Sequence, residues 1–164
     1  MILSAAYLYL APLLPAAETY RNVQLETPLR IYTSDGRLID EIGNRRNPVI
    51  EEEIPRVLLN AVSATEDSRF YSHPGVDLQS LLRVFYGAVR GQRTGGGSTI
   101  TMQLAKNLSF DSDSIYLRKL KEIPFAPQLQ RELSNEKFLT LYINTIYFGA
   151  GADGIGALPT MYYG

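Results

Sequence analysis

Residues 64–75, ATEDSRFYSHPG, collect several side chains that can do acid–base chemistry. Two adjacent acids, Glu66 and Asp67, are followed by Arg69 and by His73, the only histidine of the chain. Adjacent residues of a helix point about 100° apart, so the two acids are not expected to share a proton. A lone glutamate among apolar neighbours has a raised pKa and can act as a general acid or base. The stretch therefore predicts either catalysis by Glu66 or an ordinary solvated helix end.

The composition excludes several other kinds of active site. The chain of 164 residues has no cysteine and one histidine. Cysteine nucleophiles are thereby excluded, and zinc sites and Ser-His-Asp triads are not expected. The formal net charge is −1, from 16 basic and 17 acidic residues, and does not favour nucleic-acid binding. Acid–base work is expected to fall to carboxylates.

Two further segments carry residues suited to anion binding. Residues 91–97, GQRTGGG, form a glycine-rich loop that either approaches a phosphate or simply connects two helices, and it lacks the lysine of a Walker loop. Residues 114–122, SIYLRKLKE, place Arg118, Lys119 and Glu122 within little more than one helical turn. Taken alone, this second segment is also typical of a solvated, salt-bridged helix face.

Mostly helices are expected to position these residues. Apolar spacing and capping residues predict one helix from about Pro55 to the acids and a second that begins after Asp77 as N-cap. A third is predicted from Ser98 to Asn107, and a fourth from Ser134 to a C-terminal Gly149. The apolar stripe of the second helix is interpreted as core packing; its residues are Leu78, Leu81, Leu82, Phe85 and Val89.

The N-terminal third differs from the helical remainder. Residues 27–50 have strand-forming residues on both sides of Asp35-Gly36, which predicts a β-hairpin. Residues 1–15 are apolar and uncharged but shorter than the roughly 20 residues of a membrane-spanning helix. We interpret residues 1–22 as an apolar membrane-anchor remnant. A signal peptide and a buried N-terminal helix remain alternatives.

The order of the blocks resembles a known family. ATEDSRFYSHPG, GGGSTITMQLAKN, RKLKE and EKFLTLYINTIYFGAGADGIGA are similar to the motifs of the peptidoglycan glycosyltransferase domain, glycosyltransferase family 51. That domain occurs in class A penicillin-binding proteins and in monofunctional transglycosylases, and LRIYTSDGRLIDEIG favours the class A branch. The resemblance implies a mainly α, lysozyme-like helical domain at residues 54–164, C-terminally incomplete, after a linker with the hairpin at residues 23–53.

The resemblance also implies a reaction. An acceptor, lipid II, attacks a glycan carried on undecaprenyl diphosphate, and the transfer is inverting. Glu66 matches the general base that takes the proton of the acceptor 4-hydroxyl, and Glu122 matches a second catalytic glutamate that positions or stabilises the reacting groups. Positions implied to bind substrate are Asp67, Ser98, Thr99, Gln103, Lys106, Arg118, Lys119 and Asn144.

Cations are implied beside the diphosphate. Lys106, Arg118 and Lys119 match the positions where the family places them, and a divalent cation, Mg²⁺ or Mn²⁺, would share their task because diphosphate oxygens are hard ligands. No metal-ligating residue is implied. We expect Asp67 and Arg69 to brace Glu66.

The family also implies partners and a location. Lipid II, the lipid-linked glycan, the membrane and other cell-wall synthesis proteins are the expected partners, without nucleic acid. The expected location is the cytoplasmic (inner) membrane, with a single-pass anchor and the catalytic domain on the extracytoplasmic face.

His73 is expected to fix the turn before Gly75 and to transfer no proton.

Some residues depart from the family pattern. Ser114 stands where the family usually has an arginine near the diphosphate. Pro124 and Pro127 fall where the family continues a helix, and an interior proline costs about 3 kcal/mol. These departures leave two alternatives open: a catalytically silent cell-wall binding or scaffold module, and a lysozyme-like peptidoglycan hydrolase that also uses a helix-borne glutamate.

Overall fold

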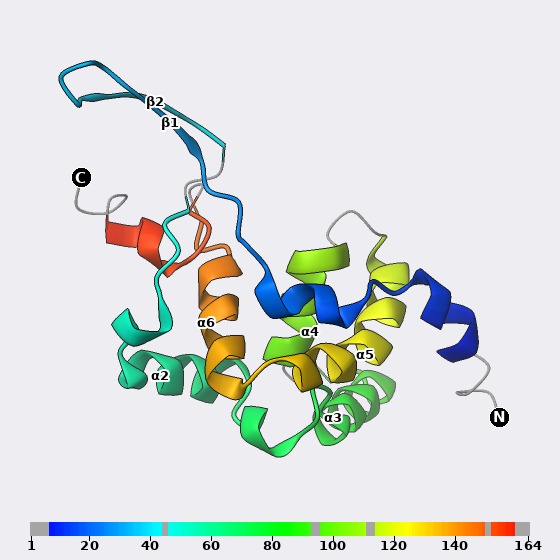
Figure 1. The fold of residues 1–164 in the computed structure, drawn as a ribbon. Helices are drawn as coiled ribbons and strands as arrows, with labels where there is room; N and C mark the ends of the chain where they lie inside the picture. The colour runs from blue at the N-terminus through cyan, green and yellow to red at the C-terminus, as the bar shows by residue number, and fades with distance from the viewer. Residues whose placement is uncertain (1–6, 44–45, 93–95, 111–113, 150–151, 160–164) are drawn as a thin grey trace. The chain divides into compact units, whose positions relative to one another are not determined.

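The computed structural model describes residues 7–43, 46–92, 96–110, 114–149 and 152–159, and its ribbon is shown in Figure 1. The fold is mainly α with one two-stranded sheet, as predicted. The chain forms two compact units, Met1–Asn22 with Arg56–Asn135 and Val23–Pro55 with Glu136–Gly164. Both units are discontinuous in sequence, because each joins a segment from the N-terminal third to a later one.

The first unit is helical. In its described part the helices α2 to α5 follow one another along the chain, and a π-helix continues α4 directly. Short 3-10 helices occupy Ala17–Asn22 and Phe70–Ser72. The α-helices are α2 (Arg56–Glu66), α3 (Leu78–Val89), α4 (Ile100–Ala105) and α5 (Ile115–Glu132), and the π-helix is Lys106–Phe110.

Local capping explains where two of these helices begin. Asp77 caps α3 as predicted, since its carboxylate accepts the backbone N–H groups of Gln79 and Ser80. The predicted N-cap of α4, Ser98, is wrong by one residue. Thr99 is the N-cap, with its hydroxyl oxygen accepting the N–H of Met102 at 3.1 Å.

Helix α5 continues through both of its prolines. Pro124 and Pro127 lie inside Ile115–Glu132, and each removes one backbone donor. Phe125 and Leu129 are fully buried on the same helix. Burying two such side chains contributes about 3–6 kcal/mol, which is comparable with the cost of the prolines. Packing therefore maintains a helix that local propensity disfavours.

The apolar stripe of α3 is largely exposed, so its interpretation as core packing is wrong. Leu78 is 69% exposed, Phe85 63% and Val89 72%. Only Leu81 packs against a buried cluster, which consists of Val76, Met102 and Ala126. Helical spacing identifies an apolar face, but burial depends on whether another element covers that face.

Residues 17–22, within the segment predicted as an anchor remnant, pack against α5. The Tyr20 ring meets the edge of Phe125 with centroids 5.9 Å apart, and its hydroxyl lies 2.7 Å from Ser109 Oγ. Residues 1–6 of that segment lie outside the described part of the chain. Among the described helices, none has the length and apolar character that crossing a membrane requires.

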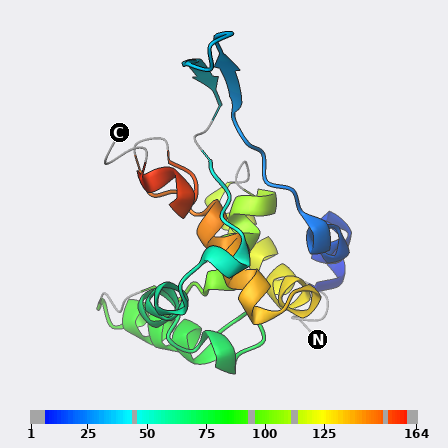
Figure 2. The ribbon, with the colours of Figure 1, turned by 60° about the vertical axis from the view of Figure 1, so that its left-hand side comes forward.

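The second unit contains the hairpin and helix α6 (Asn135–Thr145), which a short 3-10 helix, Ile155–Ala157, follows. Strands β1 (Leu29–Tyr32) and β2 (Leu38–Ile42) pair antiparallel around Gly36, which has φ +84°, and this confirms the predicted hairpin. Figure 2 shows the two strands as a narrow ribbon.

Helix α6 ends before the predicted Gly149. After Thr145 the chain forms an isolated bridge between Tyr147 and Asp153. Gly154 then donates its N–H to the carbonyl of Ile146 at 2.9 Å. These non-local backbone bonds replace the last helical turns.

Gly75 provides a test of this packing. A Cβ there would lie 2.8 Å from the carbonyl oxygen of Ala126, and φ is +100°. We expect Gly75→Ala to lower the free energy of unfolding by about 3 kcal/mol, because strain and overlap add. Gly36→Ala is the matched control: its φ is +84°, no described atom lies within 4 Å of the added Cβ, and the expected cost is about 1 kcal/mol. Urea unfolding of both variants measures the difference, and equal losses would contradict the packing argument.

Candidate functional site

A polar cleft of about 360 Å³ opens in the first unit. Its wall is formed by the end of α2, the start of α3 and the segment that leads into α4. Residues along this wall include Glu66, Arg69, Ser80, Arg83, Ser98 and Gln103. The lining residues include three acids, two arginines and several residues with hydroxyl or amide groups, which suits a polar ligand such as a sugar better than an apolar one.

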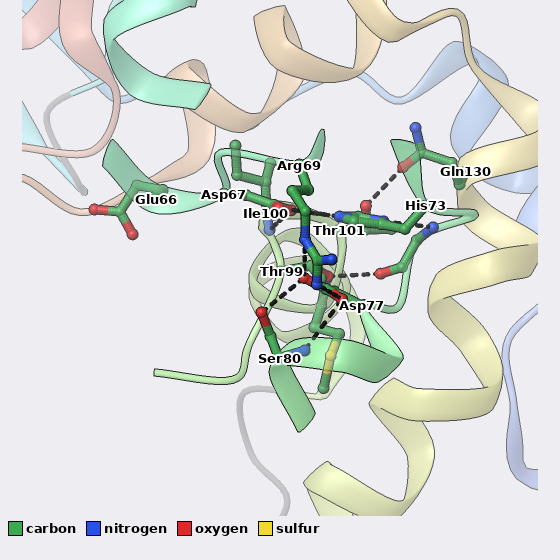
Figure 3. A network of polar contacts seen from close by, with 12 residues as sticks. Glu66, Asp67, Arg69, His73, Asp77, Ser80, Thr99, Ile100, Thr101 and Gln130 are labelled. Carbon is green, nitrogen blue, oxygen red and sulfur yellow. Dashed lines mark hydrogen bonds and ion pairs between the residues drawn. The ribbon is translucent and has the colours of Figure 1, made fainter. Parts of the chain in front are cut away.

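Glu66 presents its carboxylate to this cleft. It is the last residue of α2 and is exposed. Its Oε2 accepts a hydrogen bond from Nε2 of Gln103 at 3.1 Å, one turn inside α4. In Figure 3, Glu66 points away from the polar network that surrounds Asp67. A carboxylate held by one amide and otherwise open to the cleft is suited to accept a proton from a bound hydroxyl.

Asp67 points the opposite way and is buried. Its side chain is 4% exposed. The carboxylate accepts the backbone N–H of Ile100 at 3.1 Å and lies 2.9 Å from Nε2 of His73. Asp67 is therefore engaged within the protein, and contact with substrate stays a prediction for this residue. The adjacent acids do not share a partner, as the sequence indicated.

Arg69 contacts Asp77, and in the described structure no bond joins it to Glu66. Its Nε donates to Oδ2 of Asp77 at 3.0 Å, and its other donors reach Asp77 Oδ1 and Gln79. Arg69 therefore braces Asp77, the residue that caps α3, and its bracing of Glu66 stays a prediction. Burial alone would raise the pKa of Asp77, but hydrogen bonds from Arg69 and Ser80 hold that pKa well below its usual range.

A cationic cluster adjoins the cleft through Ser98. Lys119 Nζ donates to Ser98 Oγ at 2.9 Å and to Oε2 of Glu122 at 2.6 Å. Arg118 Nε lies 3.4 Å from Oε1 of Glu122, which accepts no hydrogen bond from the described residues. Glu122 is 1% exposed. Two cations beside one buried carboxylate give the cluster a net positive charge, which suits binding an anion.

The remaining predicted residues fall into three situations. Lys106 is half-buried, begins the π-helix, and has no side-chain partner in the described part of the chain. Thr99 is buried as the cap of α4. Asn144 belongs to the second unit, where its amide accepts from the N–H of Val49 at 2.9 Å and donates to the Val49 carbonyl at 2.8 Å. Its contact with substrate stays a prediction.

Two residues of the cleft were missed from the sequence. Ser80 and Arg83 line it from α3. With the cap Asp77 they recur every three residues and so share one helix face, which was a usable signal. Residues 93–95 of the predicted glycine-rich loop lie outside the described part of the chain, whereas Gly96 and Gly97 line the cleft.

The acidic residues in the described part of the chain do not gather into a metal site. The described residues contain no group of three or more His, Cys, Asp or Glu side chains placed to hold an ion. The side chains around Glu122 are cations, which repel a metal.

Known proteins resemble this chain over nearly its full length. The family described as Transglycosylase matches residues 35–164. Penicillin-binding protein 1A of Pseudomonas aeruginosa is 45% identical over 163 residues, which are 98% of this chain and 20% of that protein. The proteins of the same name from Vibrio cholerae and Escherichia coli are each 41% identical over 160 residues, 96% of this chain and 19% of theirs. The chain thus spans about a fifth of the length of these relatives.

The depressed pKa of Asp77 predicts a pH-dependent stability. Because the folded pKa is lowered, the stabilisation is present above the unfolded value near pH 4 and is lost as the pH falls toward the folded value. Asp77→Asn should lower the free energy of unfolding by about 2 kcal/mol at pH 7, and by less at pH 3. Urea unfolding at both pH values measures this, with the exposed Asp40→Asn as control. A difference that stays constant between the two pH values would count against the Arg69–Asp77 pair.

Proposed function

The chain belongs to the transglycosylase family, and from that premise we propose that it is a peptidoglycan glycosyltransferase that polymerises lipid II. The proposed transfer is inverting, with Glu66 as general base. The observation that carries the proposal is the pairing of an open carboxylate with a cationic cluster. Glu66 and Ser98 line one cleft, and Ser98 is hydrogen-bonded to Lys119 of that cluster.

The proposed step needs a base and a stabilised leaving group. Glu66 takes the proton of the acceptor 4-hydroxyl as that oxygen bonds to the anomeric carbon of the donor. The bond from this carbon to the diphosphate oxygen breaks, and the diphosphate leaves with the electron pair. Glu66 suits the first role because its carboxylate is exposed and is held by Gln103. Asp67 does not, since its carboxylate is buried and already accepts hydrogen bonds.

Lys119, Arg118 and Lys106 are proposed to stabilise the departing diphosphate. Glu122 orients the first two of them, since its carboxylate lies 2.6 Å from Lys119 Nζ and 3.4 Å from Arg118 Nε. Preorganised cations aimed at developing negative charge act strongly where water is excluded. A serine stands at position 114, so these three cations carry the task without the arginine usual there. A divalent cation bound to the diphosphate would add charge neutralisation.

A membrane location fits the substrate and the surface of α3. Lipid II and the lipid-linked glycan keep isoprenoid tails in the bilayer while their diphosphates reach the cleft. The large exposed apolar side chains on α3 are Leu78, Leu82, Phe85, Tyr86 and Val89. A single exposed apolar face of this kind suits contact with a lipid surface. We propose the extracytoplasmic face of the cytoplasmic membrane; the single-pass anchor and partner proteins of cell-wall synthesis stay predictions.

One observation favours a second candidate. Ser114 removes an expected cation, so a catalytically silent module that binds lipid II without polymerising it is the alternative. A peptidoglycan hydrolase is less well supported, because hydrolysis of finished glycan leaves no diphosphate for Arg118 and Lys119 to stabilise.

Loss of the proposed base should abolish polymerisation. We expect Glu66→Gln to lower kcat at least about 100-fold, because the amide cannot accept the proton. Glu52→Gln, an exposed glutamate in the other unit, should leave the rate unchanged. Gel analysis of glycan length from labelled lipid II in vesicles, with a divalent metal present, measures both. Binding of lipid II without polymer in the wild type would support the silent module, and sugar released from finished peptidoglycan would support hydrolysis.

Removing one cation should act on the same step. Lys119→Met is expected to lower kcat about 100-fold, because the leaving group loses a preorganised donor. Lys121→Met is the matched control, because it removes a lysine of the same helix, α5, that is not assigned to the diphosphate. Lys121 Nζ lies over the Phe110 ring, 5.6 Å from its centroid. Single-turnover rates at saturating lipid II compare the two. Equal rates in both variants would remove Lys119 from the proposed mechanism.

A further inference from the structure

The 3-10 helix Ala17–Asn22 is fastened to the rest of the helical unit at two points. Figure 1 shows this segment beside α5. The hydroxyl of Tyr20 lies 2.7 Å from Oγ of Ser109 in the π-helix, and the guanidinium of Arg21 forms an ion pair with Glu132 at the end of α5. The partners in these contacts are 89 and 111 residues apart along the chain. Packing therefore brings this segment to the two elements that carry the proposed diphosphate cations.

Three aromatic rings place Tyr20 next to the π-helix. The Tyr20 ring meets the edge of Phe125 with centroids 5.9 Å apart, and Phe110, the last residue of the π-helix, meets the same ring at 5.4 Å. Both phenylalanines are buried. Edge-to-face pairs contribute about 0.5–1.5 kcal/mol each beyond the burial of their area. Phe125 therefore links Tyr20 on one side to the end of the π-helix on the other.

The π-helix depends on contacts of this kind. Helices with i→i+5 hydrogen bonds are rare and occur mostly as single turns, frequently at functional sites. Lys106–Phe110 is one such turn and continues α4 without a break. Its last two residues have partners outside the turn, because Ser109 contacts Tyr20 and Phe110 packs on Phe125. These tertiary contacts stabilise the π-helix against an ordinary continuation of α4.

Lys106 is the residue whose position this helix determines. It follows Gln103 by three residues, so both lie on one face of the helix, and Gln103 lines the cleft. Lys119 is held by hydrogen bonds to Ser98 and Glu122, whereas Lys106 has no side-chain partner in the described part of the chain. The direction of the Lys106 ammonium group therefore depends on the backbone that carries it.

We propose that Tyr20 is a positioning residue for Lys106. Its hydrogen bond to Ser109 holds the π-helix in the conformation that directs the Lys106 ammonium group toward the departing diphosphate. The proposal rests on the proposed function, because that function assigns Lys106 to the diphosphate. Tyr20 itself contacts Ser109 and Phe125 and touches no substrate in this assignment.

Small changes at the two hydroxyl groups test the hydrogen bond. Tyr20→Phe removes the hydroxyl and keeps the ring that packs on Phe125. We expect it to lower kcat on labelled lipid II about 5- to 20-fold with KM changed less than about twofold, because a misplaced cation weakens stabilisation of the transition state more than binding. Ser109→Ala should cause the same loss, and Ser109→Thr, which keeps a hydroxyl, should recover most of it.

Arg21→Gln is the matched control on the same 3-10 helix. It removes the ion pair with Glu132, in which the arginine side chain is 61% exposed. Exposed ion pairs contribute little, so kcat should stay within about twofold of the wild-type value. Circular dichroism at the assay temperature verifies that each variant is folded. A loss in Arg21→Gln equal to that in Tyr20→Phe would overturn a role specific to the hydroxyl.

A double-mutant cycle separates positioning from general stabilisation. Lys106→Met removes the cation that Tyr20 is proposed to position, so adding Tyr20→Phe should lower kcat no more than about 1.5-fold further. In the Lys119→Met background the full loss from Tyr20→Phe should persist, because Lys119 is held by other partners. Equal further losses in both backgrounds would overturn the proposal, as would unchanged kcat in folded Tyr20→Phe.

Failure of the proposed function gives a different result. A wild type without polymerising activity overturns the proposed function and the positioning role together. An active wild type with full activity in Lys106→Met removes Lys106 from the mechanism and overturns its positioning as well. An active wild type in which Lys106→Met is impaired and Tyr20→Phe is not overturns positioning alone.

Amide hydrogen exchange measures the π-helix without an assay of activity. We expect Tyr20→Phe to speed exchange in peptides that cover residues 103–110 and to leave exchange in peptides that cover α3 unchanged. Unchanged exchange in residues 103–110 would overturn the support that Tyr20 is proposed to give.

Discussion

A buried carboxylate must find donors, and this constraint organises the helical unit. An unpaired ionised group in the interior costs several kcal/mol, so the chain arranges N–H groups or cations around it. Asp67 is satisfied by Ile100 and His73. Asp77 is satisfied by Arg69 and by the first turn of α3. In each case the donor belongs to another element or to a neighbouring turn, so meeting the demand also joins the elements around the cleft.

Adjacent acids with opposite surroundings explain how the same stretch provides both structure and chemistry. Asp67 is turned inward, and its carboxylate oxygens are engaged in hydrogen bonds within the protein. Glu66 is turned outward and lines the cleft. Among the described residues, its carboxylate accepts a hydrogen bond from Gln103. A proton acceptor must keep a lone pair available for the incoming proton. A buried structural anion instead needs its lone pairs engaged in hydrogen bonds. The helical rotation of about 100° between neighbours lets one dipeptide do both.

How far prediction from sequence succeeded depended on the range of the interaction. The hairpin at Asp35-Gly36 and the cap at Asp77 were predicted correctly, because turn and capping chemistry acts over a few residues. The stripe on α3 was misread because nothing in its own spacing tells whether a partner covers it. Likewise, the end of α6 was misplaced, since backbone bonds to residues 152–154 replace its last turns.

The sequence by itself determined the order of the blocks, the helical class, the capping and turn residues, and the resemblance that singled out Glu66. These follow from residue types and short spacings, which the chain carries in any conformation. Only the tertiary structure decided that Asp67 is buried, that Arg69 forms an ion pair with Asp77, and that Lys119 bridges Ser98 to Glu122. Such pairings depend on which groups lose contact with water together. Ile100 lies 33 residues from Asp67 along the chain, so packing alone makes them neighbours.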